Sequence, residues 1–106
     1  AKKARSEEFD VYFAAGSAAV TGAPLGEVAR LVNYLRRNPS ATVTLAGYVS
    51  GGENRALARR RVDVVRGLLV SRYGIEARRI HATAYGIAYF SPLPAKNRVV
   101  VAHAGE

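Results

Sequence analysis

Two prolines bound the segment that most limits how this chain folds. Pro24 and Pro39 enclose an apolar stripe whose members recur at spacings of three and four residues: Leu25, Val28, Leu31, Val32 and Leu35. Pro24 suits the first turn of a helix, where its missing N–H has no partner to lose. Pro39 disfavours helical geometry at the residue before it. The sequence therefore predicts an amphipathic helix over residues 24–37, with Arg36 and Arg37 in its last turn.

Shorter patterns on both sides of this helix predict strands and a second helix. Residues 41–47 (ATVTLAG) alternate between apolar and polar side chains and are partly β-branched, which is typical of a strand. A second helix is expected from Asn54 to about Tyr73, with Gly74 ending it in the left-handed conformation. Further strands are expected over residues 9–13, 80–85 and 98–102, and the stretch from 86 to 97 is expected to be a loop.

The predicted elements follow the order β-α-β-α-β-β. Strands joined through a helix are usually parallel, and both helices then cover one face of the sheet. We therefore expect an α+β sandwich with a mixed four-stranded sheet and two long helices packed on one face. Residues 1–8 are polar and charged and are expected to be a flexible lead-in, while 9–106 fit a single domain.

The chain is strongly basic. Sixteen Lys and Arg against eight Asp and Glu give a net charge of +8. This balance favours anionic partners such as nucleic acid, acidic lipid or the cell wall, or it serves solubility alone. Nucleic acid is not expected, because the tyrosines do not interleave with the basic residues as a stacking ladder would require. No segment approaches the ~20 consecutive apolar residues of a membrane span. The opening Ala1-Lys2-Lys3, without an initiator Met, indicates a piece of a longer chain, so any tether or signal is expected outside this stretch.

The residue types that catalysis requires are scattered. His81 and His103 have no Cys or carboxylate at metal-ligand spacing, and the chain has no cysteine at all. The serines stand in no nucleophile motif, and the acids do not form the pair that glycoside hydrolysis needs. We therefore expect no enzymatic activity, no metal and no other cofactor.

Arg61 is the most informative charged residue of the second helix. It lies four residues after Leu57 and four before Val65, so it falls on or beside the apolar stripe of that helix. A guanidinium near a buried face usually has a carboxylate or a carbonyl partner. The partner of Arg61 is either an anionic ligand or a group within the chain.

Three more polar residues surround the turn before this helix. Tyr48 and Ser50 stand at the end of a strand, where open α/β sheets commonly place ligands, although Ser50 is also an ordinary turn residue. Asn54 stands near the start of the helix. It either caps the helix or contacts a ligand.

Four stretches together resemble one known family. They are VYFAAGSAAVT (11–21), LVNYLRRNPSATVTLAGYVS (31–50), NRALARRRVDVVRGLLVSRYGIEARRIHATAYG (54–86) and AKNRVVV (95–101). In this order they are similar to the OmpA-like carboxy-terminal domain, which is also found in peptidoglycan-associated lipoproteins and flagellar stator proteins. The resemblance implies a periplasmic domain, tethered to the outer or inner membrane, that binds peptidoglycan without a covalent bond.

The resemblance also implies a ligand site. In that family an Asp at the end of the second strand and an Arg of the second helix hold the diaminopimelate of the stem peptide. Arg61 matches this Arg, Asn54 matches the Asn at the start of the helix, and Arg98 matches the Arg of the closing Asn-Arg pair. Ser50 replaces the Asp, and losing this charge-assisted contact costs about 1.5–3 kcal/mol, or roughly tenfold to a hundredfold in affinity. We therefore expect weakened or altered peptidoglycan binding through these residues and Tyr48.

A second hypothesis keeps the fold and gives up the ligand. The loop at 86–97 carries apolar Tyr89, Phe90 and Leu93 where the family has mostly polar residues. Exposed aromatic side chains of this kind anchor protein interfaces. The domain would then be an interaction or assembly module of an envelope complex, docking a partner or a second copy, or the loop would fold down and plug the old pocket.

Overall fold

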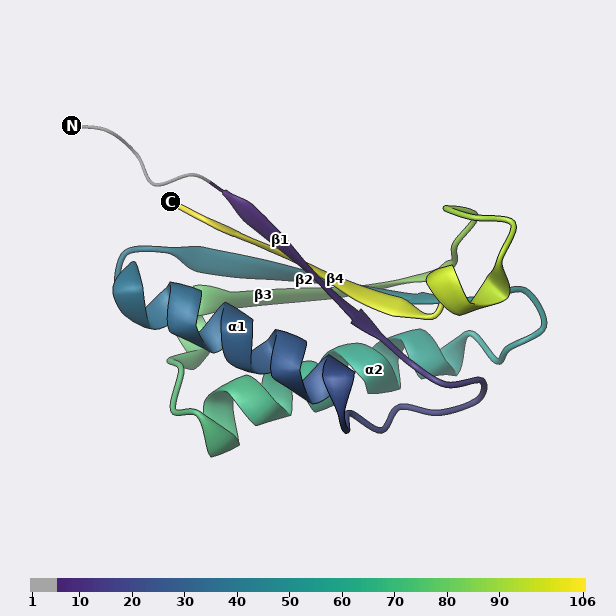
Figure 1. Cartoon of the computed structure of the whole chain (residues 1–106), viewed down its shortest axis with the longest axis horizontal. Coiled ribbons are helices and arrows are strands. Elements are labelled where there is room, and N and C mark those ends of the chain that lie inside the picture. Colours follow the sequence, from purple (N-terminus) through teal and green to yellow (C-terminus); the bar gives the residue numbers. More distant parts are fainter. Residues whose placement is uncertain (1–5) are drawn as a thin grey trace.

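The computed structural model describes residues 6–106 and has a single mixed sheet (Figure 1). Its strands lie in the order β1–β4–β2–β3. Their bounds are β1 (Glu7–Tyr12), β2 (Thr42–Val49), β3 (Ile80–Ile87) and β4 (Val99–Gly105). β4 runs antiparallel to both β1 and β2, whereas β2 and β3 are parallel. The predicted mixed four-stranded sheet is thereby confirmed.

Two helices cover one face of this sheet, as Figure 1 shows. α1 (Ala23–Arg37) connects β1 to β2, and α2 (Ala56–Gly67) leads towards β3. α1 has Pro24 in its first turn and buries most of the predicted stripe: Val28, Leu31, Val32 and Leu35. The apolar faces of both helices pack against the sheet, so the predicted α+β architecture with its helices on one face is correct.

The second helix differs from the prediction at both ends. Asn54 and Arg55 lie before the first residue of α2, so the helix begins two residues later than expected. Its continuation, η1 (Leu68–Arg72), is π-helical. Apolar spacing alone does not distinguish this wider turn from an α-helix. Gly74 adopts a φ of 71°, as expected for the residue that ends the helix.

Several strands are longer than their sequence patterns suggested. β1 begins at Glu7, so Glu7 and Glu8, assigned to the lead-in, instead pair with Ala104 and His103. Of the remaining lead-in, Ser6 is exposed and precedes the strand, and residues 1–5 lie outside the described residues. β4 pairs with a neighbour on each side, and these partners extend it to Gly105. Within the predicted loop at 86–97, a short 3-10 helix, η3, spans Pro94–Lys96.

α2 approaches the backbone of β2 closely at Gly47. A Cβ atom built on Gly47 would overlap Val62 Cγ2 and lie 2.5 Å from the carbonyl oxygen of Ala58. Glycine is therefore required here because nothing larger than hydrogen fits. The register between β2 and β3 also shifts between Gly47 and Tyr48. The close approach brings Arg61, which precedes Val62 in α2, to the end of β2, where it donates to the carbonyl of Tyr48.

The opposite face of the sheet carries neither α1 nor α2 (Figure 1). Alternate residues of the strands point to this open face, including Tyr12 of β1, Tyr48 of β2 and Tyr85 of β3. Within residues 6–106, no helix has the length and apolarity that crossing a bilayer requires.

Candidate functional site

A buried ion pair joins α2 to the turn that precedes it. The Arg61 side chain is 0% exposed, and its Nη2 lies 2.6 Å from Glu53 Oε2. Nη1 lies 2.9 Å from Glu53 Oε1, so the contact is bidentate, which is the strongest geometry for this pair of groups. The partner of Arg61 in this structure is therefore a group within the chain.

Backbone carbonyls use the remaining N–H groups of Arg61. Nε donates to the carbonyl oxygen of Ser17 at 2.8 Å. Nη1 donates to that of Tyr48 at 3.1 Å, and Nη2 donates to that of Ala14 at 3.3 Å. A guanidinium has five N–H donors, and all five are paired. A ligand carboxylate would reach this guanidinium only by displacing Glu53 or a carbonyl.

Glu53 is held as firmly as its partner. The backbone N–H groups of Gly16 and Ser50 donate to its carboxylate at 2.8 and 2.9 Å. Burial by itself raises the pKa of Glu53, but the hydrogen bonds from Arg61, Gly16 and Ser50 and the charge of Arg61 outweigh it and lower the pKa to about 2. Glu53 is therefore a carboxylate at neutral pH, and it ties the β1–α1 loop to the end of β2 and to α2.

Two of the predicted site residues meet this pair through their backbones. Ser50 is 3% exposed and contributes its N–H, not its hydroxyl, to Glu53. Tyr48 contributes its carbonyl oxygen to Arg61, while its ring lies on the open face of the sheet. Neither side chain is among the hydrogen-bond partners of Arg61.

The other two predicted residues make local bonds of their own. Asn54 Oδ1 accepts the backbone N–H of Ala56 at 2.9 Å, a local turn contact, whereas the N-cap of α2 is Arg55. Arg98 Nε donates to the carbonyl of Phe13 at 3.1 Å. The centroid of the Phe13 ring lies 5.2 Å from Arg61 Cζ, so Arg98 contacts Phe13, which in turn packs on Arg61. Ligand contacts by these residues remain a prediction.

Sequence analysis did not single out Glu53. The available signal was composition, because Glu53 is the only acid between Gly47 and Arg61. It stands three residues after Ser50, the position at which the resemblance led us to expect an Asp. The turn folds back so that Glu53 returns a carboxylate to the end of β2.

Comparison with known proteins places this fold. The family model described as "OmpA family" matches residues 12–93. The chain belongs to the OmpA family. Outer membrane porin F of Pseudomonas aeruginosa is 29% identical to this OmpA-family chain over 83 residues, which is 74% of the chain and 24% of the porin. The chain thus spans about a quarter of that relative.

Solved structures share the fold of this domain. The OmpA-like domain of FopA1 from Francisella tularensis superposes with a TM-score of 0.81 at 20% identity, covering 93% of this chain and 72% of that one. The peptidoglycan-associated lipoprotein from Burkholderia pseudomallei gives 0.71 at 20% identity, covering 92% and 90%. Identities this low establish the fold of this OmpA-family domain but not its ligand.

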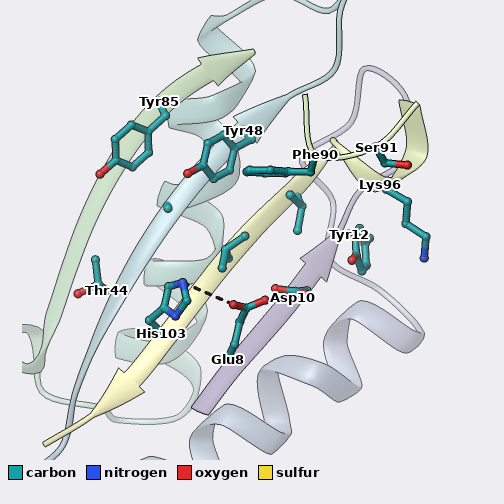
Figure 2. A pocket seen from close by; sticks show the side chains of 13 residues that line it. Glu8, Asp10, Tyr12, Thr44, Tyr48, Tyr85, Phe90, Ser91, Lys96 and His103 are labelled. Atoms are coloured by element: carbon teal, nitrogen blue, oxygen red, sulfur yellow. Dashed lines mark ion pairs between the residues drawn. The ribbon is translucent and has the colours of Figure 1, made fainter. Parts of the chain in front are cut away.

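A second feature of the OmpA-family domain lies on the open face. A hollow of about 620 Å³ runs across the strands there, with aromatic rings at one end and carboxyl groups at the other (Figure 2). The Tyr48 and Tyr85 rings have centroids 5.5 Å apart and planes 12° apart. Phe90 meets Tyr48 edge-on at 4.8 Å. Phe90 therefore packs on the open face and does not plug the site at Arg61, where Glu53 is the partner.

The loop expected to dock a partner is well exposed. Tyr89 is 85% exposed, Leu93 61% and Phe90 59%. Docking through these residues remains a prediction.

The far end of the hollow is polar. Glu8 Oε1 lies 3.6 Å from His103 Nε2, and Asp10 also lines this end. Burial, followed by the hydrogen bond and the charge of Glu8, raises the pKa of Asp10 to about 6. Across residues 6–106, no cluster of three or more His, Asp or Glu side chains is arranged to hold a metal ion.

Proposed function

We propose that this chain is a non-catalytic periplasmic domain of the bacterial cell envelope that associates with peptidoglycan through its basic surface, and not through Arg61. Membership of the OmpA family supports the envelope role, and one relative of the same fold is named a peptidoglycan-associated lipoprotein. Attachment to the outer or inner membrane is assigned to segments beyond these 106 residues.

The observation that carries this proposal is that every N–H donor of Arg61 is already paired within the chain. A ligand carboxylate that entered the site would exchange one bidentate carboxylate contact for another, because Glu53 already supplies two oxygens at 2.6 and 2.9 Å. The exchange would also leave Glu53 buried without its partner, and breaking a buried pair in this way costs about 3–5 kcal/mol. Nothing in this geometry favours a ligand at Arg61 over Glu53.

The charge of the helical layer supports an alternative route to the wall. The helices α1 and α2 and the π-helical turn carry exposed arginines on their outer surface: Arg30, Arg36, Arg37, Arg59, Arg60, Arg66 and Arg72. Only two of them, Arg30 and Arg59, have carboxylate partners among the described ion pairs. The stem peptides of peptidoglycan carry carboxylates. Attraction between exposed charges is screened by salt, with a Debye length of about 10 Å at 0.1 M ionic strength.

Sedimentation with purified sacculi tests this proposal. We expect the wild-type chain to be retained at low salt and released as salt is added. The double variant Arg60→Glu with Arg66→Glu should lose retention. Single variants with an equal change in net charge are the control: Arg78→Glu, which lies off the helical layer, should keep more retention than Arg66→Glu. Glu53→Gln should be retained as well as wild type, because Glu53 faces no ligand.

Two results would overturn the proposal in different ways. Absence of retention even at low salt would remove the wall-binding role and leave the interaction module, with Tyr89 and Leu93 as anchors, as the better explanation. Retention that resists salt and is strengthened in Glu53→Gln would show that a ligand carboxylate enters the site at Arg61 in place of Glu53.

A further inference from the structure

The hollow on the open face has three packed aromatic rings at one end. Figure 2 shows the rings of Tyr48 and Tyr85 side by side with their faces turned to the viewer, who looks onto the sheet. Their centroids lie 5.5 Å apart with planes at 12°, so the two rings are offset-stacked; this pair forms an aromatic platform, and Phe90 meets the Tyr48 ring at 77°. Tyr85 is 64% exposed and Phe90 59%, so the platform is open to a ligand. The stacked tyrosine pair offers an apolar surface to one face of a ring-shaped ligand, and the Phe90 ring contacts its edge.

The remainder of the hollow is lined by small and polar side chains. Ala46 of β2 and Val101 of β4 are register partners on the two strands between β3 and β1. Thr44, Glu8 and His103 lie at the far end (Figure 2). The Glu8 and His103 side chains are 51% and 59% exposed, so both are accessible to a ligand. These groups offer hydrogen-bond acceptors and donors within the same hollow as the aromatic platform. A ligand suited to it has an apolar ring face and polar groups at its edge.

Charge narrows the class of ligand further. Two acids, Glu8 and Asp10, face one lysine, Lys96, in the hollow, so the formal sum is −1 with His103 neutral. An anionic chain such as nucleic acid would meet these carboxyl groups at close range. A basic peptide would approach against the net charge of +8 on the whole chain. An uncharged ligand avoids both penalties.

We propose that this hollow binds a neutral oligosaccharide of N-acetylated amino sugars, the chemistry of the glycan strand of peptidoglycan. The apolar face of a pyranose ring stacks on Tyr48 and Tyr85, while its hydroxyl and acetamido groups bond to the polar lining around Glu8 and Thr44. This inference rests on the proposed wall association for its source of ligand. It differs in its site, which lies on the sheet face away from the arginines of the helical layer.

Titration with a chito-oligosaccharide, the linear oligomer of N-acetylglucosamine, tests the site directly. The readout is the amide chemical shift of each residue in the whole 106-residue chain. We expect saturable shifts in β2, β3 and β4 around the hollow. Tyr85→Ala should weaken binding about tenfold, because an exposed aromatic contact is lost without disturbing the core. Tyr85→Phe keeps the ring and should bind nearly as wild type does.

Tyr89→Ala is the matched control, because Tyr89 is 85% exposed but does not line the hollow. It should bind as wild type does. The inference is wrong if no saturable shifts occur at millimolar sugar, if they gather on α2, or if Tyr85→Ala and Tyr89→Ala behave alike. It is also wrong if a lysine-rich peptide occupies the hollow more tightly than the sugar.

Sacculi and glycan strands stripped of their stem peptides separate this inference from the proposed function. Loss of sacculus retention with intact sugar binding would overturn only the charge-driven wall association. Salt-sensitive retention on sacculi, with no binding to stripped strands or chito-oligosaccharide, would overturn only the glycan site.

Discussion

Glu53 Oε2 lies 2.6 Å from Arg61 Nη2, and the two side chains are only 8% and 0% exposed. The pair also receives or donates hydrogen bonds at Ala14, Gly16, Ser17, Tyr48 and Ser50. It therefore joins the β1–α1 loop, the end of β2 and α2 at one point. In this chain, the arginine that the family resemblance associates with a ligand holds three segments of the domain together.

Removing the carboxylate of Glu53 should destabilise the fold. Glu53→Ala leaves the Arg61 guanidinium buried without its partner, and we expect a loss of about 3–5 kcal/mol in the free energy of unfolding. Urea denaturation followed by circular dichroism measures it. Asp63→Asn is the control, because its contact with Arg59 spans 3.8 Å between side chains that are more than half exposed, and its loss should stay within about 0.5 kcal/mol. Equal midpoints for the two variants would contradict a structural role for the pair.

Acid should weaken the domain through the same residue. The pKa of Glu53 is about 2 in the folded chain against an ordinary value of 4.5. A lowered pKa stabilises the fold above the ordinary value, and this contribution of about 3 kcal/mol is lost as the pH falls from 4.5 through about 2.

Glu53→Gln removes this titration, so its unfolding free energy should change less than that of wild type over the same acid range. Urea midpoints at a series of pH values measure both slopes. Parallel curves for wild type and variant would show that Glu53 is not the group responsible.

A methyl group at Gly47 should be poorly tolerated. It would overlap Val62 and approach the Ala58 carbonyl, so α2 must move away from β2. We expect Gly47→Ala to destabilise the fold by about 1–3 kcal/mol or more. Gly26→Ala is the matched control, because Gly26 lies within α1 with nothing within 4 Å of a built Cβ. It should stabilise the helix by about 0.5–1 kcal/mol. Similar melting temperatures for both variants would contradict the close approach.

Asp10 should oppose stability at neutral pH. Its pKa is about 6 when folded against an ordinary 3.8, so the stabilising protonated state is present below 3.8 and lost as the pH rises through 6. Asp10→Asn stays uncharged and should be more stable than wild type above pH 6, with the difference shrinking towards pH 3.8. Thermal melts at these two pH values measure it. A variant that is less stable than wild type above pH 6 would show that the charge of Asp10 is needed.

Local patterns were sufficient for much of the fold. The stripe between Pro24 and Pro39 predicted α1 because helix boundaries depend on residues within the same turn. The limits of the strands were less accurate, as at Glu7 and Gly105, because ladder partners elsewhere in the chain extend them.

The candidate site was harder to predict from the sequence because its contacts also join residues far apart in the chain. Arg61 was recognised from its place on an apolar stripe, but its partner could not be chosen without knowing that the turn folds back. The hollow depends on β2 and β3 lying side by side. Alternation alone places Tyr48 and Tyr85 on a face of each strand but does not bring their rings together.

Tyr48 belongs to both surfaces described above. Its carbonyl accepts a hydrogen bond from Arg61, its ring forms part of the platform, and the register of β2 against β3 shifts at this residue. Thermodynamic linkage between two sites is reciprocal. If a ligand on the Tyr48 ring changes the free energy of the contact between the Tyr48 carbonyl and Arg61, then breaking that contact changes the binding free energy of the ligand by the same amount. Tyr48 thus joins the ion pair on the helical side to the hollow on the open face within one residue.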